Sequence, residues 1–334
     1  MKNILVTGGA GFIGANLVEY LLENTEDKII NLDKLTYAAD LTNLEKVNSH
    51  KNYKFVEGDI CDAQLIEKIF NEEDITDVIH LAAESHVDNS ISGPEVFIDT
   101  NVKGSFNLIH RAFLSWMENP HEKKAGFESS RFLHVSTDEV YGTLGDTGLF
   151  TEETPYAPNS PYSASKASSD MIIRSYHHTF GMNTVITNCS NNYGPYQHKE
   201  KLIPTIIRKA ISGEDIPVYG DGRNVRDWLY VKDHCSGISL AFDKGVAGET
   251  YNVGGRNERQ NIDIVKDICS ILDSKKPKAS GEKYESQIRF VRDRPGHDQR
   301  YAIDATKLEG YLGWRARENF TSGIEKTIDW YLKE

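Results

Sequence analysis

The sequence predicts an α/β protein whose core is a doubly wound parallel sheet, followed by a smaller C-terminal domain. Two observations support this prediction. A glycine-rich motif at the N-terminus lies between an apolar segment of strand length and a segment of helical periodicity. Apolar runs and helical segments then alternate to about residue 188, which is typical of a parallel sheet covered by helices on both faces.

The N-terminal segment has the order strand, glycine turn, helix. Residues 4–6 are apolar, a G-x-G-x-x-G motif occupies residues 9–14, and apolar residues recur at helical spacing over residues 13–21. Glycines allow the backbone to approach a pyrophosphate, and the N-terminus of the following helix offers free N–H groups. The motif therefore predicts a Rossmann-type dinucleotide-binding fold.

Asp33 indicates which dinucleotide is bound. It ends the apolar run IINLD, nineteen residues after Gly14. A carboxylate at this position accepts hydrogen bonds from the ribose hydroxyls of NAD and repels the 2′-phosphate of NADP. NAD is therefore the expected cofactor.

Three further strands are expected to end at the same edge of the sheet. YKFVEGDI ends in Asp59 and Ile60, TDVIHLAAES ends in small residues, and RFLHVSTDEVYG contains two adjacent acids; a helix is expected over residues 94–116. Ligands of parallel sheets bind beyond the carboxyl ends of the strands. These segments and the glycine turn are therefore expected to line one cleft.

The overall composition limits the classes of function. The chain has 334 residues, a formal net charge of −12 and a pI near 5.4. A general nucleic-acid-binding protein needs a basic surface, so that class is not expected. The sequence shows neither a signal peptide nor an apolar stretch of membrane-spanning length, and its four cysteines follow no metal-binding spacing. We therefore expect a cytoplasmic protein without a membrane segment or a metal site.

Tyr162 and Lys166 form the first candidate catalytic pair. They are four residues apart in a segment that is expected to become helical at Ser160 or Pro161, so they share one helix face. An ammonium group near a phenol lowers the pKa of the tyrosine, which can then act as a general base at neutral pH. Such pairs are common on solvated helices, but the NAD motif upstream favours catalysis here.

Asp138 and Glu139 form the second candidate pair, directly after Thr137 at the end of a predicted buried strand. Adjacent strand residues point to opposite faces, but the backbone can turn where a strand ends, so both carboxyls could reach one substrate. Two neighbouring carboxyls split their pKa values, which leaves one group protonated and the other ionised. An elimination needs such an acid and base; the alternative interpretation is a strand cap and turn.

These motifs resemble those of the extended short-chain dehydrogenase/reductase family, which acts on nucleotide sugars, and most closely its 4,6-dehydratases. The similarity covers nearly the full length. The adjacent acids of STDE are its most specific mark, because epimerases and decarboxylases on the same scaffold lack them. The matching stretches include TGGAGFIG, HLAAESHVDNSI, STDEVYG, YAPNSPYSASKASSD, TNCSNNYGPYQHKEKLIP, PVYGDGRNVRDWLYV and RDRPGHDQRYAID.

The resemblance implies a reaction, the dehydration of dTDP-glucose to dTDP-4-keto-6-deoxyglucose. Tyr162, helped by Lys166 and Thr137, would take the C4 hydroxyl proton while the C4 hydride passes to tightly bound NAD. Glu139 would then remove the C5 proton, and Asp138 would protonate the leaving C6 hydroxyl. The hydride would return to C6, and C5 would be reprotonated.

The resemblance also implies the binding residues. Arg226 and Arg294 are the expected diphosphate ligands, since a guanidinium binds two oxygens at once. The cofactor site is expected to contain Gly8, Gly11, Phe12, Ile13, Gly14, Asp33, Lys34, Leu35, Thr36, Asp59, Ile60, Leu81, Ala82, Ala83, Ser85, Thr100, Tyr162, Lys166 and Asn192. The nucleotide-sugar site is expected to contain Ser85, Thr137, Asn191, Lys201, Leu202, Pro217, Val218, Tyr219, Arg226, Asn261, Arg294 and His297.

The domain organisation and the partners follow from the same resemblance. Residues 1–188 are expected to form the NAD-binding domain and residues 189–334 mainly the nucleotide-sugar-binding domain, with segments such as 227–231 returning to the main sheet. Family members commonly form homodimers through a four-helix bundle, to which the helices after Pro94 and Pro161 would contribute. Three alternatives stay open: a 4,6-dehydratase of UDP-linked or N-acetylated sugars, a 4-epimerase, and a non-catalytic NAD-binding regulatory protein.

Overall fold

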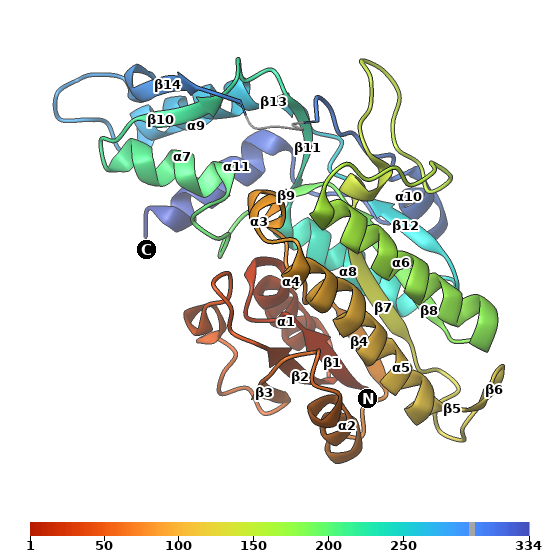
Figure 1. Ribbon diagram of the computed structural model, residues 1–334. Coiled ribbons are helices and arrows are strands. Elements are labelled where there is room, and N and C mark those ends of the chain that lie inside the picture. Colours follow the sequence, from red (N-terminus) through yellow and green to blue (C-terminus); the bar gives the residue numbers. More distant parts are fainter. Residues whose placement is uncertain (294–297, 334) are drawn as a thin grey trace.

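The computed structural model describes residues 1–293 and 298–333, and its central element is a seven-stranded parallel sheet (Figure 1). The strand order is β12-β8-β7-β4-β1-β2-β3. From β1 the chain moves to one edge, and from β4 onward it moves to the other, so the predicted doubly wound topology is confirmed. The strands are β1 (Asn3–Thr7), β2 (Lys28–Asp33), β3 (Tyr53–Glu57), β4 (Asp77–His80), β7 (Phe132–Thr137), β8 (Thr184–Cys189) and β12 (Thr250–Val253).

Helices cover both faces of this sheet because its strands send apolar side chains to both sides. Ile4 and Val6 of β1 pack in the cluster that contains α1 and α8, whereas Leu5 packs in the cluster that contains α2, α5 and α6. The carboxyl ends of the strands stay accessible at the edge of these layers. The helices are α1 (Phe12–Asn24), α2 (Ala63–Glu72), α5 (Ser105–Trp116), α6 (Pro161–Phe180) and α8 (Val231–Lys244).

Helix α6 begins where the sequence predicts it. Ser160 is the N-cap, and its Oγ accepts a hydrogen bond from the Ser163 N–H at 3.0 Å, while the Ser163 side chain bonds back to the Ser160 N–H. Pro161 follows at the first helical position, where its missing N–H costs nothing. This capping box fixes Tyr162 in the first turn of the helix.

The segment before α5 differs from the sequence prediction of one helix over residues 94–116. After α3 (Val87–Ser92), the structure has α4 (Glu95–Phe97), a π-helical segment η2 (Ile98–Gly104) and only then α5. Asn101 of η2 exchanges two hydrogen bonds with the backbone of Glu84, at 2.8 and 3.0 Å. The wider turn holds Asn101 against the chain after β4, a contact that helical periodicity does not reveal.

The later elements form two smaller sheets around a separate apolar cluster. β11 pairs in parallel with β9 and antiparallel with β13, and β10 pairs with β14. Three helices share that apolar cluster. These elements are β9 (Asn191–Tyr193), β10 (Ile216–Tyr219), β11 (Val225–Tyr230), β13 (Glu258–Gln260), β14 (Ile288–Val291), α7 (Leu202–Ile211), α9 (Asn261–Lys275) and α11 (Phe320–Tyr331).

The expectation that residues 227–231 join the main sheet is wrong. They lie mostly in β11 of a small sheet, and β12 is the strand that returns, pairing with β8 from Ile186 to Cys189. The crossover through α8, which packs on the same face as α1, delivers β12 to the edge beside β8. The division of the chain at residue 188 stays a prediction.

The remaining elements are short. Within the described part of the chain, none of the helices combines the length and the apolar character needed to cross a membrane. The short elements are η1 (Leu41–Leu44), β5 (Met117–Asn119), β6 (Glu122–Lys123), η3 (Asp138–Tyr141), η4 (Tyr284–Gln287) and α10 (Thr306–Leu312).

Candidate active site

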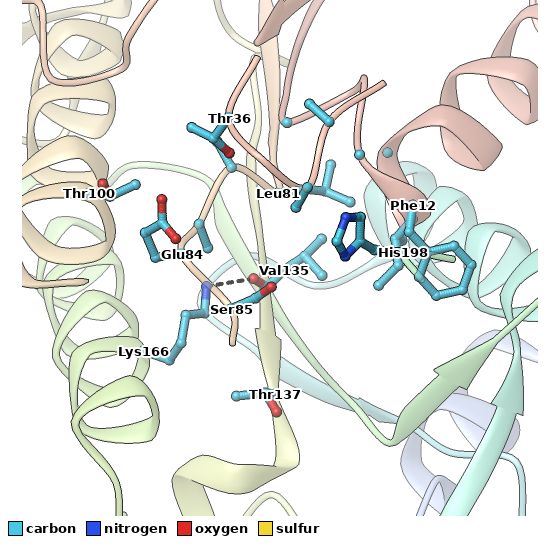
Figure 2. Close-up of a pocket in the computed structure, with 18 of the residues that line it drawn as sticks. Phe12, Thr36, Leu81, Glu84, Ser85, Thr100, Val135, Thr137, Lys166 and His198 are labelled. Atoms are coloured by element: carbon cyan, nitrogen blue, oxygen red, sulfur yellow. Dashed lines mark hydrogen bonds between the residues drawn. The ribbon is translucent and has the colours of Figure 1, made fainter. Parts of the chain in front are cut away.

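A cavity of about 320 Å³ lies at the carboxyl ends of β1, β2, β4, β7 and β8. Figure 2 shows Leu81, Ser85, Val135 and Lys166 grouped around this space. Most of the predicted site residues, from both halves of the chain, are in its wall. They are Gly8, Gly11, Phe12, Ile13, Gly14, Asp33, Lys34, Thr36, Asp59, Ile60, Leu81, Ala82, Ala83, Ser85, Thr100, Thr137, Asp138, Glu139, Tyr162, Lys166, Asn191, Asn192 and Lys201.

Among the described residues, seven predicted binding residues are not in the cavity wall. Leu35 packs against the apolar cluster of α1. Arg226 is buried in β11, with its guanidinium carbon 4.3 Å from the centre of the Tyr301 ring. Arg294 and His297 lie outside the described residues. The other five are in the C-terminal elements: Leu202, Pro217, Val218, Tyr219 and Asn261.

The glycine turn forms a narrow cradle at the start of α1. Gly8 has a φ of +76°, and a Cβ on Gly14 would lie 2.1 Å from the Gly8 carbonyl oxygen. Neither position therefore accepts a larger residue without strain. The turn brings the N-terminus of α1 into the cavity wall at Gly11, Phe12 and Ile13.

Asp33 braces the same turn from the end of β2. Its Oδ2 accepts a hydrogen bond from the Ala10 N–H and its Oδ1 one from the Leu35 N–H, both at 2.9 Å. Burial raises the pKa of Asp33, and the two backbone hydrogen bonds act in the opposite direction. Each oxygen can accept one more hydrogen bond, and Asp33 lines the cavity, so the cradle and this carboxylate fit the phosphates and the ribose of NAD.

The two acids reach the cavity because the chain leaves strand geometry at Thr137. The Thr137 hydroxyl accepts a hydrogen bond from the Glu139 N–H at 3.3 Å and caps the turn η3. Asp138 and Glu139 therefore stand in a tight turn instead of a strand, and both line the cavity. Strict alternation would have sent one of them away from it.

Asp138 is the more deeply buried member of the pair. Its side chain is 2% exposed, and among the described residues its Oδ2 has no hydrogen-bond partner. Burial raises the pKa of Asp138 well above its ordinary value, and the charges of Glu139 and Asp227 add to this effect. The protonated form of Asp138 is therefore favoured, which suits a role as an acid.

Tyr162 is also buried, and the expectation that Lys166 lowers its pKa is wrong for the protein alone. Burial raises the pKa of Tyr162 well above its ordinary value, and Glu139 and Cys189 raise it further, whereas hydrogen bonding to Thr137 lowers it. The Lys166 ammonium is directed to β7, where Nζ donates to the Val135 carbonyl at 2.9 Å (Figure 2). Desolvation of the phenol therefore outweighs the hydrogen bonding to Thr137.

The cavity wall also contains residues that sequence reasoning did not assign to the site, among them Glu84, Gln197 and His198. Glu84 lies between two predicted residues in LAAES, so its position was detectable. Gln197 and His198 come from the loop after β9, which carries no periodic signal. The Asn16 side chain of α1 donates to the Pro195 carbonyl at 3.0 Å and holds this loop at the cavity.

The known proteins that the chain matches include nucleotide-sugar dehydratases. Residues 5–327 match the family model described as GDP-mannose 4,6 dehydratase. The chain is 54% identical to the dTDP-glucose 4,6-dehydratase of Xanthomonas campestris pv. campestris (strain B100), over 99% of this chain and 93% of that one. The chain belongs to the dTDP-glucose 4,6-dehydratase family.

Solved structures of these dehydratases have the same fold. The enzyme of Bacillus anthracis str. Ames, in complex with NAD, aligns with a TM-score of 0.88 and 46% identity over 100% of this chain and 97% of that one. The enzyme of Streptomyces venezuelae, with NAD and dTDP bound, aligns with a TM-score of 0.90 and 43% identity, over 99% and 97%. The resemblance inferred from the motifs is thus confirmed at the level of the family.

Proposed function

We propose that the protein is a dTDP-glucose 4,6-dehydratase, which converts dTDP-glucose to dTDP-4-keto-6-deoxyglucose and water and keeps NAD bound through the cycle. One observation carries this proposal. A single cavity combines a dinucleotide cradle with a tyrosine and with two adjacent carboxyls, of which Asp138 is the more deeply buried one, with a raised pKa. Oxidation and elimination can therefore occur on one bound sugar.

The first step uses the groups of α6. When bound, oxidised NAD supplies a two-electron acceptor for the C4 hydride and a positive charge that favours the Tyr162 phenolate. Tyr162 takes the proton of the C4 hydroxyl of the sugar. The Thr137 hydroxyl lowers the pKa of Tyr162 and orients the C4 hydroxyl. Lys166 remains anchored to β7 through the Val135 carbonyl.

The second step uses the groups of η3. A ketone at C4 acidifies the C5 proton, which the Glu139 carboxylate removes. Asp138 donates its proton to the C6 hydroxyl, which leaves as water. The different surroundings of the two neighbours separate their roles, since Asp138 is 2% exposed and Glu139 is only partly buried.

The substrate diphosphate needs local positive charge in a protein of net charge −12. Lys201 lies in the cavity wall, and its Nζ donates to the Ser85 carbonyl at 3.3 Å. We assign the diphosphate to Arg226 and Arg294 and the nucleotide to the C-terminal elements. The further residues assigned to this binding site are Ser85, Asn191, Leu202, Pro217, Val218, Tyr219, Asn261 and His297.

The alternatives explain less of this site. A 4-epimerase needs no acid to expel a hydroxyl, so it gives no reason for a buried Asp138 with a raised pKa beside Glu139. A non-catalytic regulatory protein requires neither the pair of Tyr162 and Lys166 nor the pair of adjacent acids. A UDP-linked or N-acetylated sugar would use the same chemistry and differs only in contacts outside the reaction centre.

The test is a mass measurement on the purified protein incubated with dTDP-glucose and, in parallel, UDP-glucose, without added NAD. Loss of one water from the dTDP sugar alone is the expected result. Loss of water from the UDP sugar alone would support the same mechanism but identify a UDP-linked sugar as the substrate. Unchanged mass for both sugars, also after NAD is added, would contradict a dehydratase of either sugar.

The proposed partner is a second copy of the chain. α5 and α6 run side by side (Figure 1) and expose Phe106, Leu114 and Met171, while Ile91, Val96 and Ile98 are exposed on the elements before them. A homodimer with a four-helix bundle would cover these side chains.

We also place the protein in the cytoplasm, a reducing compartment that suits its four free cysteines.

A further inference from the structure

We propose that Asp170 is a positioning residue for the reaction: its carboxylate fastens α6 to the end of β7 and is the counter-charge of Lys166. The proposal rests on the function proposed above. Tyr162, Lys166 and Asp170 follow one another at four-residue spacing, so they share one face of α6. The two candidate catalytic residues are thus followed by a carboxylate in the protein core.

The Asp170 carboxylate is 1% exposed, and its Oδ2 accepts two hydrogen bonds, whereas among the described residues its Oδ1 has no hydrogen-bond partner. Ser136 Oγ donates to Oδ2 at 2.7 Å, and the Tyr156 hydroxyl donates to the same oxygen at 3.0 Å. His134 Nε2 lies 3.2 Å from Oδ1. A buried carboxylate is kept only when such contacts offset its desolvation.

These partners come from the segments that carry the acid pair. Ser136 directly precedes Thr137, so its bond to Asp170 anchors the last residues of β7. Tyr156 reaches the other end of η3, because its ring lies 5.3 Å from the Tyr141 ring in an edge-on contact. The Asn188 amide donates to both tyrosine hydroxyls, at 2.9 Å to Tyr141 and at 3.2 Å to Tyr156. One carboxylate therefore holds the turn of the acid pair against α6.

A nitrogen of His134 lies close to both the Asp170 carboxylate and the Lys166 amine. Lys166 Nζ lies 3.3 Å from His134 Nε2, which is the atom close to Asp170. Burial lowers the pKa of Lys166, and the charge of Asp170 raises it again. Asp170 thus favours the charged form of an otherwise desolvated amine.

The other titratable groups around Lys166 do not replace this charge. Burial lowers the pKa of His80 on β4 and of His134 on β7 well below the ordinary value, so both are neutral. Burial raises the pKa of Cys189 on β8 to about 12 and that of Tyr162 on α6 above its ordinary value, so both keep their protons. Asp170, whose pKa burial raises to about 6, is still largely ionised at neutral pH.

Two variants separate the charge from the hydrogen bonds. Asp170→Asn removes the charge and keeps the shape, so Lys166 should lose its proton at lower pH. We expect the alkaline limb of the kcat profile to move down by about one pH unit, with kcat about tenfold lower at the optimum and KM within about twofold. Ser136→Ala removes a hydrogen bond that lowers the pKa of Asp170, so the acid limb near pH 6 should move to higher pH.

The measurement is the pH profile of water loss from dTDP-glucose by the NAD-containing enzymes. Asp243→Asn and Ser168→Ala, at exposed positions, are the matched controls and should leave both limbs in place. An equal loss of kcat at every pH in Asp170→Asn would mean a merely structural role and overturn the proposal. If Asp170→Asn does not fold, a Ser136→Ala enzyme whose acid limb stays in place overturns the proposal. An inactive wild-type protein would instead refute the proposed function.

Discussion

Asp138 and Glu139 are neighbours in the chain, and their roles follow from unequal burial. The turn at Thr137 brings both carboxyls to one cavity, but the Asp138 side chain is enclosed and Glu139 is only partly covered. The low polarity around Asp138 favours its neutral form, and the neighbouring charge of Glu139 adds to this preference. The pair can therefore act as acid and base at the same pH.

Glu139→Gln should stop the reaction after the first step. Without a base the C5 proton stays in place, while oxidation at C4 does not need Glu139. We expect kcat to fall by about 10²–10⁴-fold and the ultraviolet absorbance of NADH to rise when dTDP-glucose is added. Glu153→Gln, at an exposed position, should behave like the wild type. Normal turnover of the Glu139 variant would remove this residue from the role of C5 base.

Asp138→Asn should lower the activity and raise the stability of the folded protein at neutral pH. The folded protein keeps the Asp138 proton to a pH above the ordinary value of 3.8, so it binds more protons than the unfolded chain, and its stability falls as the pH rises through this window. Removing the carboxyl should gain about 1–3 kcal/mol at pH 7. Denaturant unfolding measures this free energy. The gain should vanish as the pH falls toward 4, and a gain independent of pH would contradict the account.

At the scale of the elements, the strand–turn–helix unit at the N-terminus determines cofactor binding. Gly14→Ala places a Cβ 2.1 Å from the Gly8 carbonyl oxygen, so the turn must open. We expect the purified variant to lose most of its NAD and about 2 kcal/mol or more of its unfolding free energy. Gly310→Ala is the control, because a Cβ there meets nothing within 4 Å inside α10. Full NAD content in Gly14→Ala would show that the cradle does not hold the cofactor.

The elements that the sequence predicted best are those with local signals. The glycine motif, the helix start at Ser160 or Pro161 and the apolar strands identified the parallel sheet and α6 because neighbouring residues determine them. The π-helical turn at Asn101 and the loop of Gln197 and His198 were missed, since contacts with distant segments shape them. The pKa of Tyr162 was mispredicted for the same reason, because burial is a property of the fold.

At the scale of the whole molecule, the exposed apolar side chains of α5 and α6 predict a dimer. Phe106 is 45% exposed and Met171 is 49% exposed. Light scattering should give twice the chain mass of 37.6 kDa for the wild type and a monomer for Phe106→Glu combined with Met171→Glu. Tyr311→Glu is the control, since this side chain is 79% exposed on α10. A monomeric wild type would exclude the proposed bundle.

The central claim is that one bound NAD takes the hydride from C4 and the same hydride returns to C6. The most direct measurement is NMR of the product formed from dTDP-glucose that carries deuterium at C4. The account predicts that the deuterium appears at C6, that one water is lost and that no NADH is released. Deuterium retained at C4 would contradict the account, because it would indicate either elimination without oxidation or an epimerase that returns the deuterium to C4. Loss of the deuterium to solvent would contradict the return of the hydride to C6.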